Sequence, residues 1–161
     1  MAENLRIAPL AAAELQDALP LIAAYQRFYE VEDVDDERNR AFFARFLAPS
    51  DDGLLLGAWG PIEEGAPASE GEELLGFVCL YWHFTPLIPA ETVLMNDLYV
   101  VEPARGRGIG RALIEASAAV GRERGAHLLQ WVTGPENKTA QRLYDTTGAE
   151  REPAIEYELE L

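Results

Sequence analysis

The chain is organised around the apolar stretch Val93-Leu94-Met95-Asn96-Asp97-Leu98-Tyr99-Val100-Val101 and the loop Arg105-Gly106-Arg107-Gly108-Ile109-Gly110 that follows it. The stretch predicts a strand, and apolar residues at helical spacing from Ile109 onward predict a helix that ends at Gly125. The first N–H groups of a helix have no intrahelical partner and lie at the positive end of its dipole. The loop therefore predicts a phosphate site, in which glycines permit close approach and arginines supply positive charge. The arginines are Arg105, Arg107 and Arg111.

Spacing separates several kinds of phosphate loop. A P-loop needs a lysine after its last glycine, and no Lys follows Gly110. A dinucleotide-binding fold needs Gly-x-Gly-x-x-Gly near the first strand, whereas here the third glycine comes one residue early and the motif lies late in the chain. A glycine-rich turn with solvated arginines stays open as an alternative.

The pattern Arg105-x-x-Gly108-x-Gly110 after a strand resembles the acetyl-coenzyme A signature of the GNAT superfamily of N-acetyltransferases. A second match follows at the distance that the family shows: Trp131-Val132-Thr133, then Asn137, then a helix that carries Tyr144 and stops before Gly148. The resemblance covers almost the whole chain, and it is greatest to the diamine and polyamine acetyltransferase branch.

Composition agrees with one soluble globular domain over residues 1–161. No apolar run is long enough to span a membrane, and the N-terminus lacks a basic signal-peptide head, so we expect a cytoplasmic protein. The net charge of −15 argues against nucleic acid or an anionic membrane as the main partner. Cys79 is the only cysteine and is expected to be buried, and no His/Cys spacing predicts a metal site.

The order of elements predicts an α/β domain with a mixed, mostly antiparallel central sheet flanked by helices, which is also the GNAT element order. Consecutive strands predict antiparallel pairing, and the helix after the central strand predicts a parallel crossover. The segment 60–73 predicts a mobile surface loop, and the strict alternation of 155–161 predicts a closing strand with one wet face. The expected strands are 5–8, 54–59, 74–84, 93–101, 127–132 and 155–161, and the expected helices are 10–29 (one helix, or two joined at Pro20), 36–47, 109–125 and 138–146.

The resemblance implies that the strand 93–101 splays from the strand 127–132 and that pantetheine lies in the gap, bonded by main-chain groups of Leu98 and Val100. Asn137 is either a coenzyme contact or only the cap of its helix. The implied coenzyme contacts are Leu98, Tyr99, Val100, Arg105, Gly106, Arg107, Gly108, Ile109, Gly110, Arg111, Asn137 and Tyr144.

Tyr144 is the candidate general acid. When an amine attacks a thioester, the sulfur leaves as a thiolate, and a phenol can give it a proton. The alternative is a core tyrosine that only packs.

Asp97 is the candidate general base, because a carboxylate in an apolar strand needs a functional or hydrogen-bonding reason. It could equally bind the substrate ammonium. The polyamine branch often has two successive acids here, but this chain has Asn96 before Asp97, so a base at the first position is not carried over. His83 is a second candidate, and His127 is expected to be structural.

The acidic segment 29–37 is expected to border the acceptor site, with Tyr29, Glu30 and Glu32 as substrate contacts beside Asp97. A solvated linker whose acids cap a helix is the alternative.

We therefore expect a direct-transfer N-acetyltransferase that uses acetyl-coenzyme A and no metal, with a small primary amine, diamine or polyamine as acceptor. An amino acid, an antibiotic or a protein amine stays open as acceptor, as do a non-catalytic coenzyme A-binding module and a nucleotide-binding protein. The expected partners are the amine and coenzyme A, with a monomer and a homodimer both open, and with no nucleic acid or membrane.

Overall fold

The computed structural model describes residues 5–63 and 71–161. Its sheet has five strands in the order β1-β2-β3-β4-β5. Neighbouring strands from β1 to β4 pair antiparallel, and β4 pairs parallel with β5, so the predicted mixed, mostly antiparallel sheet is confirmed. The strands are β1 (Arg6–Pro9), β2 (Gly53–Gly60), β3 (Glu73–Thr85), β4 (Ala90–Val100) and β5 (Leu129–Gln130). Residues 64–70 of the predicted loop lie outside the described part of the chain.

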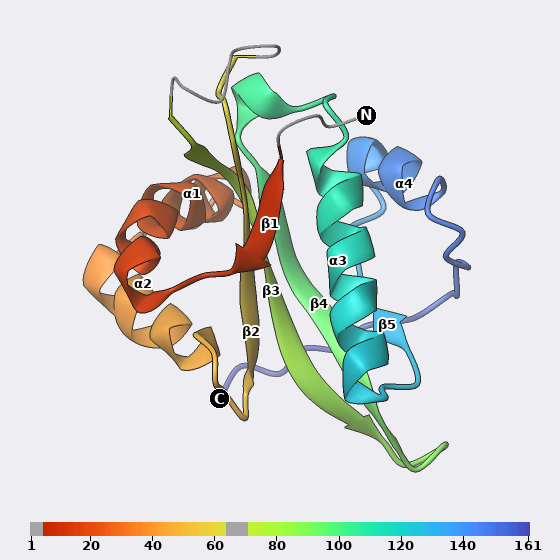
Figure 1. Ribbon diagram of the computed structural model, residues 1–161. Coiled ribbons are helices and arrows are strands. Elements are labelled where there is room, and N and C mark those ends of the chain that lie inside the picture. Colours follow the sequence, from red (N-terminus) through yellow and green to blue (C-terminus); the bar gives the residue numbers. More distant parts are fainter. Residues whose placement is uncertain (1–4, 64–70) are drawn as a thin grey trace.

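Helices cover both faces of the sheet (Figure 1). On one face lie α1 (Leu15–Phe28) and α2 (Asp36–Phe43), and on the other lies α3 (Ile109–Arg124), beside the short α4 (Lys138–Tyr144). Pro20 lies inside α1, so the segment with two sequence interpretations is one helix after the 3₁₀ turn η1 (Ala12–Glu14). Asp35 caps α2 by accepting from the Arg38 N–H at 2.7 Å, as its position before the helix predicted.

The core has two layers because the central strands are buried on both sides. The apolar run 74–84 predicts burial on both faces; residues 74–80 of β3 are buried without exception, whereas residues 81–84 are half-buried or exposed. Phe77 packs toward α1 and α2, whereas Val78 packs toward α3. Cys79 is fully buried, also as predicted.

A β-bulge at Asn96 divides β4 into two parts. Cys79 of β3 stands opposite Asp97, but the next residue, Leu80, stands opposite Met95, so Asn96 has no partner on β3. Such an extra residue shifts every later residue to the other face of the strand. The bulge therefore turns the Asp97 side chain toward the α1 side of the sheet, where it would otherwise face α3.

The parallel pairing between β4 and β5 extends over only two residue pairs. It joins Val93 to Leu129 and Leu94 to Gln130, and the segment from residue 131 to the start of α4 has no strand structure. The strand predicted at 127–132 is therefore shorter than expected, because its second half separates from β4. This separation is the splay that the resemblance implied.

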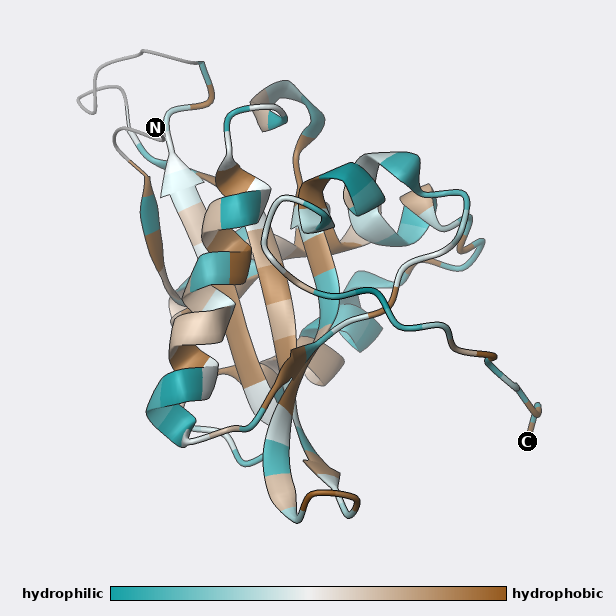
Figure 2. Ribbon diagram, turned by 90° about the vertical axis from the view of Figure 1, so that its right-hand side faces the viewer, coloured by the Kyte–Doolittle hydropathy of each residue, from teal (hydrophilic) through white to brown (hydrophobic). Residues whose placement is uncertain are grey.

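The predicted closing strand at 155–161 is wrong for this structure. Residues 149–161 have no regular secondary structure, and the segment runs away from the body of the molecule (Figure 2). Alternation gives a segment one apolar face, but a strand also needs a neighbour that supplies hydrogen bonds. Within the described residues, this segment has no such neighbour.

Candidate active site

A cavity of about 520 Å³ opens where β4 and the chain after β5 separate. One wall is the second half of β4, the other is the segment from Trp131 to Asn137 with α4, and the first turn of α3 closes one end. Ligands of α/β proteins commonly bind beyond the carboxyl ends of parallel strands, and the cavity lies at that position for β4 and β5. The cleft thus joins the two sequence motifs that lie far apart along the chain.

The N-terminus of α3 presents free backbone donors to this cleft. Gly108 precedes the helix in the left-handed conformation with φ of 81°, and no side chain caps the helix. The hydrogen-bond ladder begins with the Ala112 N–H, which donates to the Gly108 carbonyl at 3.0 Å. The N–H groups of Ile109, Gly110 and Arg111 therefore have no partner inside the helix, which suits an anion.

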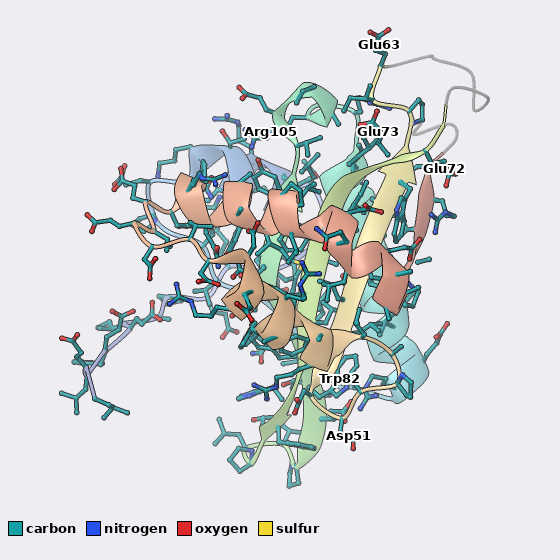
Figure 3. All side chains as sticks on the ribbon, turned by 90° about the vertical axis from the view of Figure 1, so that its left-hand side faces the viewer. Asp51, Glu63, Glu72, Glu73, Trp82 and Arg105 are labelled. Atoms are coloured by element: carbon teal, nitrogen blue, oxygen red, sulfur yellow. The ribbon has the colours of Figure 1, made fainter. Side chains whose placement is uncertain are left out.

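Arg105 and Arg111 line the same end of the cleft. Arg105 donates from Nε to the Val100 carbonyl at 3.0 Å, and its guanidinium lies over the Tyr99 ring at 5.6 Å. Figure 3 shows Arg105 at the opposite end of the sheet from Asp51 and Trp82. Arg111 pairs with Glu115 one turn along α3 at 3.0 Å. Positive charge thus gathers at the donor-rich helix end of an acidic protein.

Arg107 does not line the cleft. Its guanidinium donates to the carbonyls of Pro61 and Ile62, both at 3.0 Å, and so fastens the loop to the end of β2. The expected coenzyme contact from this side chain is therefore not supported by its placement. Sequence spacing located the loop, but the carbonyls that hold Arg107 lie far upstream in the chain.

The bulge also decides which main-chain groups of β4 face the cleft. Before the bulge, the Val93 N–H points to the β5 side of β4 and donates to the Leu128 carbonyl at 2.9 Å. After the bulge, the Val101 N–H points to the β3 side and donates to the Leu75 carbonyl at 2.9 Å. Because pairing alternates along a strand, Leu98 and Val100 turn their main-chain groups toward the gap. The Arg105 contact with the Val100 carbonyl agrees with this direction. These are the main-chain groups that the resemblance implied.

Tyr144 lies on the wall opposite β4 and lines the cleft. Its ring meets that of Trp131 edge to face, with centroids 5.3 Å apart. Burial, followed by the neighbouring Tyr29, raises the pKa of the Tyr144 hydroxyl above its usual 10.0. Tyr144 is therefore neutral at physiological pH and able to donate a proton.

Asn137 caps its helix, one of the two roles that the sequence left open, and its position leaves the other, a coenzyme contact, as a prediction. Its side chain caps α4 by accepting from the Ala140 N–H at 3.1 Å, and the residue also lines the cleft. The cap uses the side-chain oxygen, which leaves its amide nitrogen available to a ligand.

Asp97 lies behind the cleft wall. Its side chain is 7 % exposed and does not line the cavity, whereas its neighbours Tyr25 and Asn96 do. Burial raises the pKa of the Asp97 carboxyl, and the neighbouring Tyr25 and the Asn96 amide, which donates to Asp97 Oδ1 at 3.2 Å, partly offset this effect. Asp97 thus lies beside Tyr25, which lines the cleft and which helical spacing places on the apolar face of the predicted helix 10–29.

The end of the cleft nearest α1 is aromatic. Tyr25, Phe28 and Tyr29 line it, all from the last turn of α1 and its cap. Of the predicted substrate contacts, Tyr29 lines the cleft, whereas Glu30 and Glu32 lie outside the lining. Phe28 was missed by sequence reasoning, although its place one residue before Tyr29 was a usable signal.

The histidines stand apart from this chemistry. Both His83, in the outer half of β3, and His127, before β5, are exposed, and neither lines the cleft.

Across residues 5–63 and 71–161, no group of His, Cys, Asp and Glu is arranged to hold a metal ion. In the same described ranges, every helix is too short or too polar to cross a membrane.

Comparison with known proteins places this cleft in context. A model of the acetyltransferase (GNAT) family matches residues 19–149. The D-amino-acid N-acetyltransferase HPA3 of Saccharomyces cerevisiae is 39% identical over 102 residues, which are 63% of this chain and 58% of that enzyme. The thialysine N-epsilon-acetyltransferase of Caenorhabditis elegans is 33% identical over 76 residues, 47% of each chain. The chain thus matches about half the length of these relatives.

Among solved structures, a probable acetyltransferase superposes with a TM-score of 0.80. It is 27% identical in sequence, and the match covers 97% of this chain and 97% of that one. The similarity extends over the sheet, the helices and the cleft-forming segments alike.

Proposed function

The chain belongs to the GNAT family of acetyltransferases, and we propose that it transfers the acetyl group of acetyl-coenzyme A directly to a primary amine of a small molecule. Membership makes it an acetyl-coenzyme A-dependent N-acetyltransferase. One observation carries the proposal about the site: the open edge of β4, the uncapped end of α3 and Tyr144 all border a single cleft.

The residues present suit coenzyme A, whose thioester supplies the activated acetyl group. Gly106 and Gly108 have φ of 80° and 81°, and a Cβ added at either would meet nothing within 4 Å, so the space directly beside them is open for a ligand. We assign the pyrophosphate to the free N–H groups of the α3 first turn, with Arg105 and Arg111 beside them. Leu98 and Val100 would pair their main chain with the pantetheine amides.

Tyr144 is the proposed general acid. Its hydroxyl would give a proton to the departing sulfur as the amine nitrogen bonds to the acetyl carbon. The raised pKa keeps the proton on Tyr144 until that moment. Because both reactants lie in one cleft, the enzyme gains mainly from holding them together, without an acetylated residue.

Tyr25 and Asp97 form the proposed path for the proton that the ammonium must lose. Asp97 is buried, so the substrate does not meet it directly. Tyr25 lines the cleft and lies beside Asp97; burial, followed by the negative charge of Asp97, raises the pKa of the Tyr25 hydroxyl. It would accept the amine proton while passing its own to the carboxylate, and Asp97 is thereby a base that acts through Tyr25.

We propose a cationic acceptor with a diamine or polyamine character. The protein has a net charge of −15, and the acids at Glu30 and Glu32 follow the aromatic end of the cleft directly in sequence. Thialysine, the substrate named for the nematode relative, also carries a side-chain amine. A D-amino acid is the second candidate, because the yeast relative named for that substrate is 39% identical over the matched segment.

Release of free coenzyme A thiol across an amine panel tests the proposal. The panel should contain spermidine, putrescine, lysine, D-amino acids, an aminoglycoside and a neutral amine, each with acetyl-coenzyme A. Product with any primary amine supports transferase activity, and the ranking assigns the acceptor. Tight binding of coenzyme A without turnover of any amine would instead favour a non-catalytic binding module, and competition by ATP would favour a nucleotide-binding protein.

A further inference from the structure

Three aromatic rings gather where the last turn of α1 meets the cleft. Phe28 and Tyr29 follow Tyr25 by three and four residues, so the three side chains neighbour one another on the helix surface. The rings of Tyr25 and Tyr29 have centroids 5.1 Å apart and planes at 64°, and those of Phe28 and Tyr29 are 5.1 Å apart at 86°. Rings at such steep angles form the walls of a corner rather than a flat stack.

Phe28 and Tyr29 are exposed, although both are large aromatic residues. They are 57 % and 54 % exposed, whereas Tyr25 beside them is half-buried and packs against the core on the α1 side of the sheet. All three residues line the cleft. Two adjacent exposed rings that border a cavity indicate a surface for a ligand rather than a part of the core.

The cleft offers no carboxylate to a bound cation. Among the described residues, those that line the cavity include no aspartate and no glutamate. Asp97 is buried, and Glu30 and Glu32 lie outside the lining. A second ammonium group on a bound acceptor therefore needs a partner other than an ion pair inside the cleft.

Aromatic ring faces can be that partner. The face of a neutral ring carries the negative part of its quadrupole and attracts a cation. The cleft already contains one such contact, because the Arg105 guanidinium lies 5.6 Å from the centroid of the Tyr99 ring. Within the described ranges, no arginine lies over Tyr25, Phe28 or Tyr29, so their faces are open to a ligand.

We propose that Phe28 and Tyr29, with Tyr25 beside them, form an aromatic cage for the second, non-reacting cation of the acceptor. The inference rests on the proposed transfer of acetyl to a primary amine. A ring face attracts positive charge without requiring N–H donors, so the cage accepts a tertiary or quaternary ammonium as readily as a primary one. The acceptor class is therefore a diamine with one alkylated end. Its primary amine takes the acetyl group as the coenzyme A thiol leaves, and its alkylated ammonium is unchanged.

Three amines with the same butyl spacer test the cage in the wild type. They are putrescine, (4-aminobutyl)trimethylammonium and 5,5-dimethylhexan-1-amine, in which an uncharged carbon replaces the quaternary nitrogen. We expect the trimethylammonium compound to exceed its neutral isostere by roughly 5- to 30-fold in kcat/KM, the range of a desolvated cation–π contact. The comparison is made in about 1 M salt, where a Debye length of about 3 Å screens the net charge of −15.

Phe28→Leu/Tyr29→Leu removes the ring faces and keeps apolar side chains at both positions. We expect the preference for the trimethylammonium compound over its isostere to disappear, mainly through a higher KM for the cation. Tyr29→Phe keeps the ring and should retain the preference. Phe84→Leu is the matched control, because Phe84 is 70 % exposed, lies in the outer half of β3 and does not line the cleft.

Two outcomes would overturn the cage while leaving the transferase proposal intact. One is acetylation of the trimethylammonium compound at least about 10-fold less efficiently than putrescine, which would show a site that needs N–H donors. The other is equal kcat/KM for the trimethylammonium compound and its isostere. Because both comparisons use the wild type, they hold even if the leucine variant fails to fold.

Binding separates the cage from the chemistry. If none of the three amines is acetylated, the transferase proposal fails, and isothermal titration calorimetry with the coenzyme A-loaded protein still ranks them by affinity. Tighter binding of the trimethylammonium compound than of its isostere, lost in Phe28→Leu/Tyr29→Leu, would support the cage by itself. Equal affinities, or a preference that the leucine variant retains, would overturn it.

Discussion

The rings of Trp131 and Tyr144 meet edge to face, with centroids 5.3 Å apart, and fix the tyrosine on the wall of the cleft opposite β4. Packing on the ring thus holds Tyr144 in position, and the contact does not use its hydroxyl proton. This arrangement separates the role of the ring from that of the hydroxyl, and the two are testable independently.

Tyr144→Phe should keep the ring contact and remove only the proton donor. We expect kcat to fall by roughly 10²–10⁴, the usual range for a lost general acid, with coenzyme affinity nearly unchanged. In the wild type, burial raises the pKa above 10.0, so the protonated, active form should persist to a pH above the ordinary tyrosine range. Steady-state kinetics from pH 7 to 11 measure both effects. Normal turnover by the phenylalanine variant would leave Tyr144 with a packing role alone.

Arg105→Ala should weaken coenzyme binding more than it changes kcat. A charge-assisted hydrogen bond is worth roughly 1.5–3 kcal/mol, or about 10- to 150-fold in Kd. Isothermal titration calorimetry with coenzyme A measures this directly. Arg122→Ala in the last turn of the same helix is the matched control, because it removes an exposed arginine far from the cleft.

Gly108→Val tests the backbone of the same loop. In the free protein the strain comes from the φ of 81°, since an added Cβ would meet nothing within 4 Å. We expect reduced coenzyme affinity from a distorted helix start, with a modest loss of stability, roughly 1–2 kcal/mol. Unchanged affinity in both Arg105→Ala and Gly108→Val, each shown to be folded, would contradict the pyrophosphate assignment.

How far the sequence could predict this site depends on the distance between interacting residues. The start and end of α3 follow from local signals, and both Gly108 and Gly125 have the positive φ that such positions favour. Arg107 lies in the same loop, but its side chain is held by carbonyls more than forty residues upstream. Local spacing cannot identify such partners.

The bulge at Asn96 limited the prediction for Asp97 in a similar way. Simple alternation gives no sign of an extra residue, yet this residue reverses the direction of every later side chain. Asp97 was rightly marked as unusual in an apolar strand, but its link to the cleft through Tyr25 depends on the packing of α1 on β4. The alternation of 155–161 likewise indicated a strand without indicating its neighbour.

Asp97→Asn should separate the effect of the buried carboxylate on folding stability from its role in catalysis. Because burial raises its pKa above 3.8, the unfolded chain ionises more readily than the folded one, and the wild type loses stability as the pH rises from about 4. The asparagine cannot ionise, so the variant should gain in thermal stability relative to the wild type between pH 4 and 7. Its kcat/KM should fall by roughly 10²-fold or more if Asp97 accepts the amine proton.

The exposed Asp51→Asn is the control for Asp97→Asn. It should alter neither the pH dependence of unfolding nor turnover. An Asp97→Asn enzyme with full activity would remove Asp97 and Tyr25 from the proton path, whereas a pH-independent stability difference would contradict the raised pKa.

The acceptor should be recognised partly through the acidic field of the protein. A polycation drawn by a net charge of −15 should show a kcat/KM that falls with salt, because the Debye length shrinks from about 10 Å at 0.1 M to about 3 Å at 1 M. A neutral amine of similar length should show no such dependence.

The decisive measurement compares spermidine with that neutral amine in the wild type and in Glu30→Gln/Glu32→Gln. Both glutamates lie outside the cleft lining, so the double variant should change association with the polycation and leave kcat in place. A preference for the neutral amine, or a double variant with an unchanged preference, would make the acidic segment solvated surface and move the search for the acceptor to amino acids, antibiotics and protein amines.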